Sequence, residues 1–318
     1  MRSEFDFIHH IKKSYGLGRI GDDCAVLPKS EEKDILMTAD MLVEDIDFRL
    51  EWTTPEFLGH KALAVSLSDI AAMAGRPNFA MLSLGVPEEL WKGDFLDRFY
   101  AGWNSLAREF EVELVGGDVS RVPEKMVIDS IVLGEVERGR AIPRSGARPG
   151  DKIYLTGSVG GAAGGLKLLE SGARIDQGLD RSVRGLIERQ LRPLPRLDVS
   201  GHLRASALID LSDGLSSDLG HICEASGVGA VIYAEQVPID VRLDSIFSSP
   251  DKKLHLALDG GEDFELLFTM DSKKNLPAEF TDLTCIGEIT ANVGKIELIR
   301  DGVASELKPK GFQHFRSN

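Results

Sequence analysis

Aspartates recur at six places in the sequence, most of them where a strand-like run meets a turn. Each residue alone has an ordinary explanation, because Asp-Gly and Gly-Asp are common turn dipeptides and aspartate caps helices. Together they supply many carboxylate oxygens without accompanying Cys or His, a donor set that favours hard divalent cations, magnesium above all. The segments are residues 20–26, 38–40, 68–69, 114–118, 208–214 and 258–263.

Two of these segments are the most informative. Asp69 lies between Leu67 and Ile70 in an apolar helical pattern, so its side chain should point inward, where a carboxylate needs a cation or hydrogen bonds. In residues 114–118, L-V-G-G-D, a strand is expected to end in two glycines and a carboxylate, which would bring the backbone close to a ligand. Asp40 is likewise expected at the end of a strand.

Two glycine-rich segments do not form standard phosphate loops. Residues 157–165 lack the G-K-[ST] of a Walker loop. The G-x-G-x-x-G of residues 16–21 follows a polar segment instead of a strand, and Asp22 and Asp23 after it would repel a pyrophosphate. A nucleotide would therefore be held through metal ions, which usually bind a few carboxylates plus substrate phosphates. The residues themselves predict a magnesium-dependent enzyme that acts on phosphates.

Length and composition are those of a two-domain globular protein. The chain has 318 residues, and 37 basic against 51 acidic side chains leave a formal charge of −14. This balance argues against a nucleic-acid partner, which needs a basic face. Three distant cysteines exclude a disulfide framework as the organising feature. With no apolar run near the roughly 18 residues of a spanning helix, and no secretory segment, we expect a cytoplasmic protein without membrane contact.

The elements that must position these aspartates follow from hydrophobic periodicity. One helix is expected from the Thr53-Thr54-Pro55 cap to Gly75, and a second over residues 87–110. The polar stretch 138–151 suggests a boundary between domains 1–140 and 141–318. We therefore predict an α/β fold of the α+β type, with two domains and mixed sheets. Strands are expected at residues 35–38, 79–86, 112–115, 126–136 and 152–156.

Seven motifs in this order resemble the thiamine-monophosphate kinase family, in the superfamily of aminoimidazole-ribonucleotide synthetase. The resemblance extends from Gly21 to Phe315. It implies an N-terminal ATP- and magnesium-binding domain that pairs in a homodimer, and a C-terminal α/β domain that completes the site. The motifs are G-D-D-C-A-V, T-A-D-M-L-V, K-A-L-A-V-S-L-S-D-I-A-A-M, L-V-G-G-D, R-S-G-A-R-P-G-D, I-D-L-S-D-G-L-S-S-D-L and G-G-E-D-F-E-L.

The implied activity is transfer of the γ-phosphoryl group of ATP to thiamine monophosphate, giving thiamine diphosphate, by direct in-line transfer assisted by Mg²⁺. The resemblance implies catalytic roles for Asp40, Asp118, Asp210 and Arg144. The implied metal ligands are Asp23, Thr38, Ala39 (main chain), Asp40, Asp69, Asp118, Asp210 and Asp213. The implied nucleotide contacts are Tyr100, Gly117, Asp118, Arg144 and Ser212, and the substrate contacts are Glu262 and Phe312.

One position departs from the family pattern, and two other functions compete. Asp47 stands where the family usually has a histidine, and it would face the cationic substrate or lie elsewhere. The first alternative is another ATP-using synthetase of the superfamily; selenophosphate synthetases, however, need a reactive Cys in a glycine-rich stretch, and Cys24 follows two aspartates. The second is a non-catalytic nucleotide or thiamine-phosphate sensor, which would not need so many metal ligands.

Overall fold

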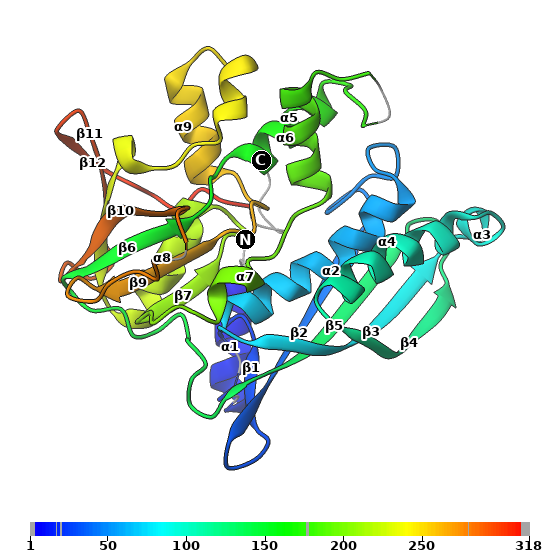
Figure 1. Cartoon of the computed structure of the whole chain (residues 1–318), viewed down its shortest axis with the longest axis horizontal. Coiled ribbons are helices and arrows are strands. Elements are labelled where there is room, and N and C mark those ends of the chain that lie inside the picture. The colour runs from blue at the N-terminus through cyan, green and yellow to red at the C-terminus, as the bar shows by residue number, and fades with distance from the viewer. Residues whose placement is uncertain (1–3, 17, 20, 176–177, 279, 313–318) are drawn as a thin grey trace.

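The computed structural model describes residues 4–16, 18–19, 21–175, 178–278 and 280–312, and the chain forms two β-sheets with helices packed against them (Figure 1). Each sheet contains one parallel pairing among antiparallel ones, so the predicted mixed α/β fold is confirmed. None of the helices in this described part of the chain combines the length and apolar character that a bilayer crossing requires.

The first sheet has the order β1-β2-β5-β3-β4, and helices α2 and α4 cover one of its faces (Figure 1). The elements of this half are α1 (Glu4–Tyr15), β1 (Ala25–Pro28), β2 (Lys33–Val43), α2 (Pro55–Ala72), β3 (Arg76–Val86), α3 (Glu88–Trp91), α4 (Phe95–Glu109), β4 (Glu113–Arg121) and β5 (Val127–Glu137).

The second sheet has the order β12-β11-β8-β10-β6-β9-β7. The elements of this half are β6 (Asp151–Thr156), α5 (Gly161–Glu170), α6 (Arg181–Leu191), α7 (Leu197–Ser200), β7 (Ala207–Asp210), α8 (Leu215–Ser226), β8 (Gly229–Tyr233), the 3₁₀ turns η1 (Ala234–Gln236) and η2 (Val241–Ser245), α9 (Pro250–Asp259), β9 (Leu266–Asp271), β10 (Leu283–Thr290), β11 (Ile296–Arg300) and β12 (Val303–Glu306).

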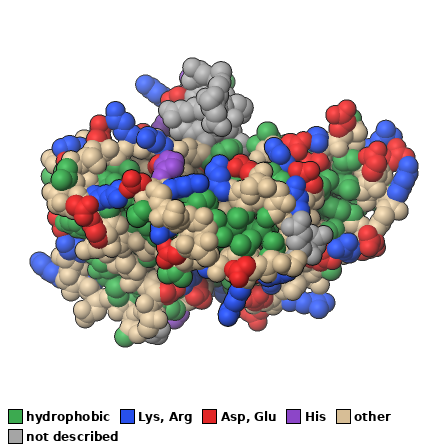
Figure 2. All heavy atoms as spheres, turned by 90° about the horizontal axis from the view of Figure 1, so that it is seen from above, with side chains coloured by type: hydrophobic (Ala, Val, Ile, Leu, Met, Phe, Trp, Pro, Cys, Tyr) green, Lys and Arg blue, Asp and Glu red, His purple; other side chains and the backbone are tan. Residues whose placement is uncertain are grey.

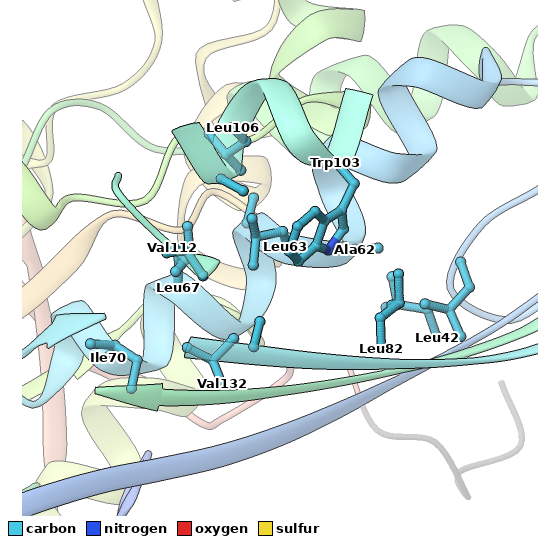
Figure 3. Close-up of a cluster of buried hydrophobic side chains, with 14 of the residues drawn as sticks. Leu42, Ala62, Leu63, Leu67, Ile70, Leu82, Trp103, Leu106, Val112 and Val132 are labelled. Carbon is cyan, nitrogen blue, oxygen red and sulfur yellow. The ribbon is translucent and has the colours of Figure 1, made fainter. Parts of the chain in front are cut away.

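Helix α2 begins where the sequence predicts. The hydroxyl of Thr54 accepts the backbone N–H of Phe57 at 3.2 Å, and Pro55 occupies the first turn. Trp103 and Leu106 of α4 lie over Leu63 and Leu67 of α2, which in turn pack on the sheet (Figure 3). The large side chains at the centre of α4 therefore belong to the core.

The second predicted helix is interrupted. The chain forms α3 and α4 with a break at residues 92–94, because Gly93 weakens the helix at that point. Trp91, at the end of α3, is consequently not part of the core and is 62% exposed.

Two strands are longer than predicted, and both contain candidate ligands in their interior. β2 pairs with β5 over its whole length, so Asp40 lies opposite Ser130 and not at a strand end. β4 continues through both glycines to Arg121, so Asp118 also lies within a strand. Gly117 has φ +152°, and a Cβ there would lie 1.9 Å from the carbonyl oxygen of Leu82; close backbone approach to β3 therefore requires glycine.

Helix α2 contributes to the cores of both halves. Its middle packs under α4, while Ala71 and Ala72 near its end belong to a cluster with Leu208 of β7 and Phe268 of β9. Nearly every residue of α2 is buried, which is the pattern of a helix enclosed on all sides. This helix therefore links the two sheets and sets the position of groups attached to it (Figure 1).

The contact between α2 and α4 predicts a strong effect of two small substitutions. A Cβ at Gly59 would lie 1.9 Å from the carbonyl oxygen of Phe99, and one at Gly102 would lie 1.9 Å from that of Glu56. Gly59→Ala and Gly102→Ala should each lower the free energy of unfolding in urea by about 2 kcal/mol or more, because the helices must separate. Gly93→Ala, with no atom nearer than 4.0 Å, is the control and should cause no loss of stability; equal losses in all three variants would contradict this packing.

Candidate functional site

Three carboxylates from distant parts of the chain meet between the two halves. One oxygen of each of Asp23, Asp69 and Asp210 lies within 4.8 Å of the others. Asp23 precedes β1, Asp69 lies on α2, and Asp210 ends β7. The inward direction predicted for Asp69 is consistent with this position, and the cluster is assembled only when both sheets pack against α2.

Hydroxyl groups orient these carboxylates. Thr38 of β2 donates a hydrogen bond to the carboxylate of Asp69. Ser68, next to Asp69 on α2, donates to Asp210 at 2.6 Å, which joins the two halves directly. The thiol of Cys24 is buried, lies 3.3 Å from the carbonyl oxygen of Asp69 and belongs to the core of the first half.

The cluster carries negative charge that the protein compensates only in part. Burial raises the pKa of Asp69 well above its usual range, aided by Asp40 and Asp210. Burial, with the charge of Asp23, also raises the pKa of Asp210 to about 8. The pKa of Asp40 is raised to about 6, mainly by burial, and its Oδ2 has no hydrogen-bond partner among the described residues. Buried oxygens in this state fit a divalent cation.

Arg144 is a basic partner of the cluster. Its guanidinium binds Asp23 at both oxygens, with Nη2–Oδ1 at 2.7 Å and Nε–Oδ2 at 3.2 Å. Its backbone N–H donates to Asp22 at 2.8 Å. Arg144, which follows the first sheet, therefore lies beside the carboxylates, as a phosphate-binding arginine would need to.

A second group lies at the start of α8. Ligand atoms of Asp213, Asp218 and His221 lie within 4.8 Å of one another. The buried carboxylate of Asp218 accepts the backbone N–H groups of Asp213, at 3.2 Å, and Gly214, at 2.9 Å. The sequence predicted Asp213 but not Asp218 or His221; their spacing of three on a helix, which puts both on one face, was the available signal.

The predicted substrate residues converge near this second group. The backbone N–H of Phe312 donates to the carbonyl oxygen of Asp213 at 3.2 Å, and the N–H of Glu262 donates to that of Ser212 at 2.8 Å. Phe312 is 50% exposed. Residues 313–315 of the closing motif lie outside the described residues.

Glu262 also has two partners that the sequence did not predict. The ammonium group of Lys61 on α2 lies 2.5 Å from its Oε1, and the side-chain amide of Gln190 on α6 donates to its Oε2. No local sequence signal pairs these residues, because they lie on three separate elements.

Other predicted residues lie apart from these groups. Gly117 and Asp118 are exposed on the edge strand β4, and the side chain of Ala39 is on the exposed face of β2. Tyr100 packs edge-to-face against Phe99, with ring centroids 5.7 Å apart. Asp47 accepts the backbone N–H of Val43 at 2.8 Å and so holds the turn after β2.

Within the described residues, neither glycine-rich segment has the surroundings of a phosphate-binding loop. Asp263 accepts the N–H groups of Gly160, at 2.5 Å, and Ala162, at 3.0 Å, so its own carboxylate occupies the turn before α5. Gly16 and Gly18 follow helix α1, as expected for a sequence that is not a dinucleotide fingerprint; Leu17 and Ile20 lie outside the described residues.

Sequence comparisons match both halves of the chain. The model of the AIR synthase related protein N-terminal domain matches residues 21–136, and that of the C-terminal domain matches residues 148–295. Thiamine-monophosphate kinase of Escherichia coli (strain K12) is 40% identical over 98% of this chain and 95% of its own. The Bacillus subtilis (strain 168) thiamine-monophosphate kinase is 38% identical over 98% of this chain and 99% of its own.

A solved structure of this family has the same fold as this chain. AaThiL complexed with AMPPCP and TMP superposes with a TM-score of 0.88 at 35% identity, covering 98% of this chain and 97% of that one. Both the sequence and the fold are therefore shared over almost the full length, and the chain belongs to the thiamine-monophosphate kinase family within the AIR synthase related proteins.

Proposed function

We propose that this protein is a thiamine-phosphate kinase, which transfers the γ-phosphoryl group of ATP to the phosphate of thiamine monophosphate and releases ADP and thiamine diphosphate. The observation that carries the proposal is the carboxylate cluster of Asp23, Asp69 and Asp210, assembled from both halves of a chain whose relatives have this activity. We also propose a cytoplasmic location, where ATP is available.

Mg²⁺ is the metal that the donor set fits. The candidate ligands are carboxylate, hydroxyl or main-chain oxygens, and Asp40 has a buried oxygen without a partner among the described residues. We propose that Mg²⁺ is held by Asp23, Thr38, Asp40, Asp69 and Asp210 at one position and by Asp213 near the second group. Asp118 and the main chain of Ala39 remain proposed ligands on β4 and β2. Bound Mg²⁺ would neutralise phosphate charge during in-line transfer.

The chain's own residues must bring two anions together. The acceptor phosphate, with a second pKa of about 6, is already largely dianionic and needs no strong base. We propose that Arg144 exchanges its contact with Asp23 for a phosphate oxygen, which would offset developing charge. We propose that Tyr100, Gly117, Asp118 and Ser212 contact the nucleotide. Glu262 and Phe312, next to the Asp213 turn, would hold the thiamine end, and Asp47 is a proposed contact beyond β2.

We further propose that residues 1–140 pair in a homodimer and that residues 141–318 form the second domain. One face of the first sheet carries α2 and α4, while the opposite face exposes apolar side chains. Met41 is 61% exposed, and Met37, Phe79 and Met81 are about 40% exposed, all on that face by strand alternation. Contiguous apolar surface of this kind marks an interaction site.

The dimer proposal predicts a change of mass on substitution. The double variant Met41→Glu and Met81→Glu should shift the protein from dimer to monomer in analytical ultracentrifugation, because charge would be buried at the interface. Val303→Glu, on the exposed strand β12 of the other half, is the control and should remain dimeric. A monomeric wild-type protein would refute the proposal.

The activity is tested by product analysis. With ATP, thiamine monophosphate and Mg²⁺, the purified protein should form ADP and thiamine diphosphate in equal amounts, and chelation of the metal should stop both. Activity on an aminoimidazole precursor instead would identify another synthetase of the superfamily. Binding of both ligands without turnover would identify a sensor.

The raised pKa of Asp210 predicts a pH-dependent gain in stability on removing its charge. Folded Asp210 holds its proton up to pH about 8 but unfolded Asp only to about 3.8, so this group destabilises the metal-free fold as pH rises between those values. Metal-free Asp210→Asn should therefore melt several degrees above wild type at pH 8 and by a clearly smaller margin at pH 5. Turnover should fall about a hundredfold or more.

A control variant separates this effect from general charge removal. Glu124→Gln changes an exposed carboxylate in the loop between β4 and β5 and should alter neither the melting temperature nor turnover. A loss of stability in Asp210→Asn at pH 8 would show that Asp210 is instead a structural hydrogen-bond acceptor for Ser68.

A further inference from the structure

A buried lysine on α2 has no place in the phosphate chemistry described above. The side chain of Lys61 is only 3% exposed, and burying an ammonium group costs several kcal/mol unless it is paired. Its ammonium lies 2.5 Å from Glu262 and 3.4 Å from the carbonyl oxygen of Gln190. The lysine therefore forms an ion pair with a residue of the other half of the molecule.

Both oxygens of Glu262 are held. Lys61 contacts Oε1, while the side-chain amide of Gln190 donates to Oε2, and the carboxylate is still 30% exposed. Two contacts from different helices fix both the position and the plane of a carboxylate, which a single contact does not. Lone pairs that remain on the exposed side are available to a ligand.

The backbone conformation at Glu262 also fixes the position of its side chain. Its φ of +66° is in the left-handed region, which is uncommon for a residue with a side chain and accumulates at functional sites. A Cβ at the preceding Gly261 would lie 2.4 Å from the carbonyl oxygen of Ser212. The turn that carries Glu262 is therefore pressed against the Ser212–Asp213 turn, next to Phe312.

We propose that Lys61 is a positioning residue for thiamine monophosphate binding: it holds the Glu262 carboxylate in the orientation that receives the thiamine end of the substrate. This inference rests on the proposed function. Lys61 lies eight residues before Asp69 on α2, about 12 Å along the helix axis. One rigid helix thus sets the separation between the phosphate end of the site and the end that recognises the cationic substrate.

The pairing also determines how Glu262 acts. Lys61 neutralises the carboxylate, so Glu262 contributes mainly through a directed contact and less through free negative charge. If orientation dominates, removing Lys61 weakens substrate binding even though the carboxylate becomes formally more negative. If free charge dominated, removing Lys61 would strengthen the binding of a cationic substrate. The two mechanisms therefore predict opposite signs.

The experiment is a double-mutant cycle with Lys61→Met and Glu262→Gln. Lys61→Met should raise KM for thiamine monophosphate about tenfold or more, since small misplacements of a binding group have effects of this size, with kcat and KM for ATP changed less than twofold. In the Glu262→Gln background the same substitution should not raise KM further. Calorimetric titration with thiamine monophosphate should show the same pattern in Kd.

Controls separate positioning from loss of folding. Lys167→Met removes an exposed lysine paired with Glu170 on α5 and should leave both KM values unchanged. Should Lys61→Met alone fail to fold, the double variant, which removes both charges, should regain the wild-type melting temperature, and Lys61→Gln replaces the single variant in the cycle. A lower KM in the single variant, an equal rise in both backgrounds, or a fall in kcat alone would overturn the proposal.

If the wild-type protein makes no thiamine diphosphate, the proposed function fails, whereas the calorimetric cycle still tests Lys61. If wild type is active and the cycle is additive, only the role of Lys61 fails.

Discussion

Repulsion among buried carboxylates is the constraint on which this structure depends. Asp23, Asp69 and Asp210 approach within 4.8 Å, and burial together with the neighbouring carboxylate charges raises the pKa values of Asp69 and Asp210. The energy that holds them together comes from packing elsewhere, since polar contacts such as Ser68 to Asp210 orient the groups without cancelling the charge. A site that is unfavourable without cations is suited to bind metal ions together with an anionic ligand.

Helix α2 is the element whose packing holds these carboxylates together. It is buried on nearly all sides, packs into the cores of both halves and carries Lys61, Ser68 and Asp69 toward the site. Glycine at positions 59 and 102 allows α4 to approach it closely. Because the same rigid helix reaches the carboxylate cluster and Glu262, these two groups keep a constant separation, which in the proposed function would help to bring two phosphates into line.

The net charge of −14 is distributed in two ways. Basic and acidic side chains are interspersed over the face seen in Figure 2, as is usual for a protein surface. A small part of the acidic excess lies in the interior, where each carboxylate has a much larger effect because water no longer screens it. The cluster contains three of the predicted aspartates; Asp40 interacts with it electrostatically, while Asp213 belongs to the second group.

Local signals in the sequence were enough to predict the fold class and the start of α2 and to single out Asp23, Asp69 and Asp210, because caps, periodicity and turn-linked aspartates are local. The ends of β2 and β4 were predicted wrongly, because the length of a strand is decided by its pairing partner. The break at Gly93 before α4 was also not predicted. Asp218 and His221 had only their helical spacing as a local signal, and Lys61 and Gln190 had none, because their partner Glu262 lies on another element. Only the packing of both sheets around α2 brings such distant charges into contact.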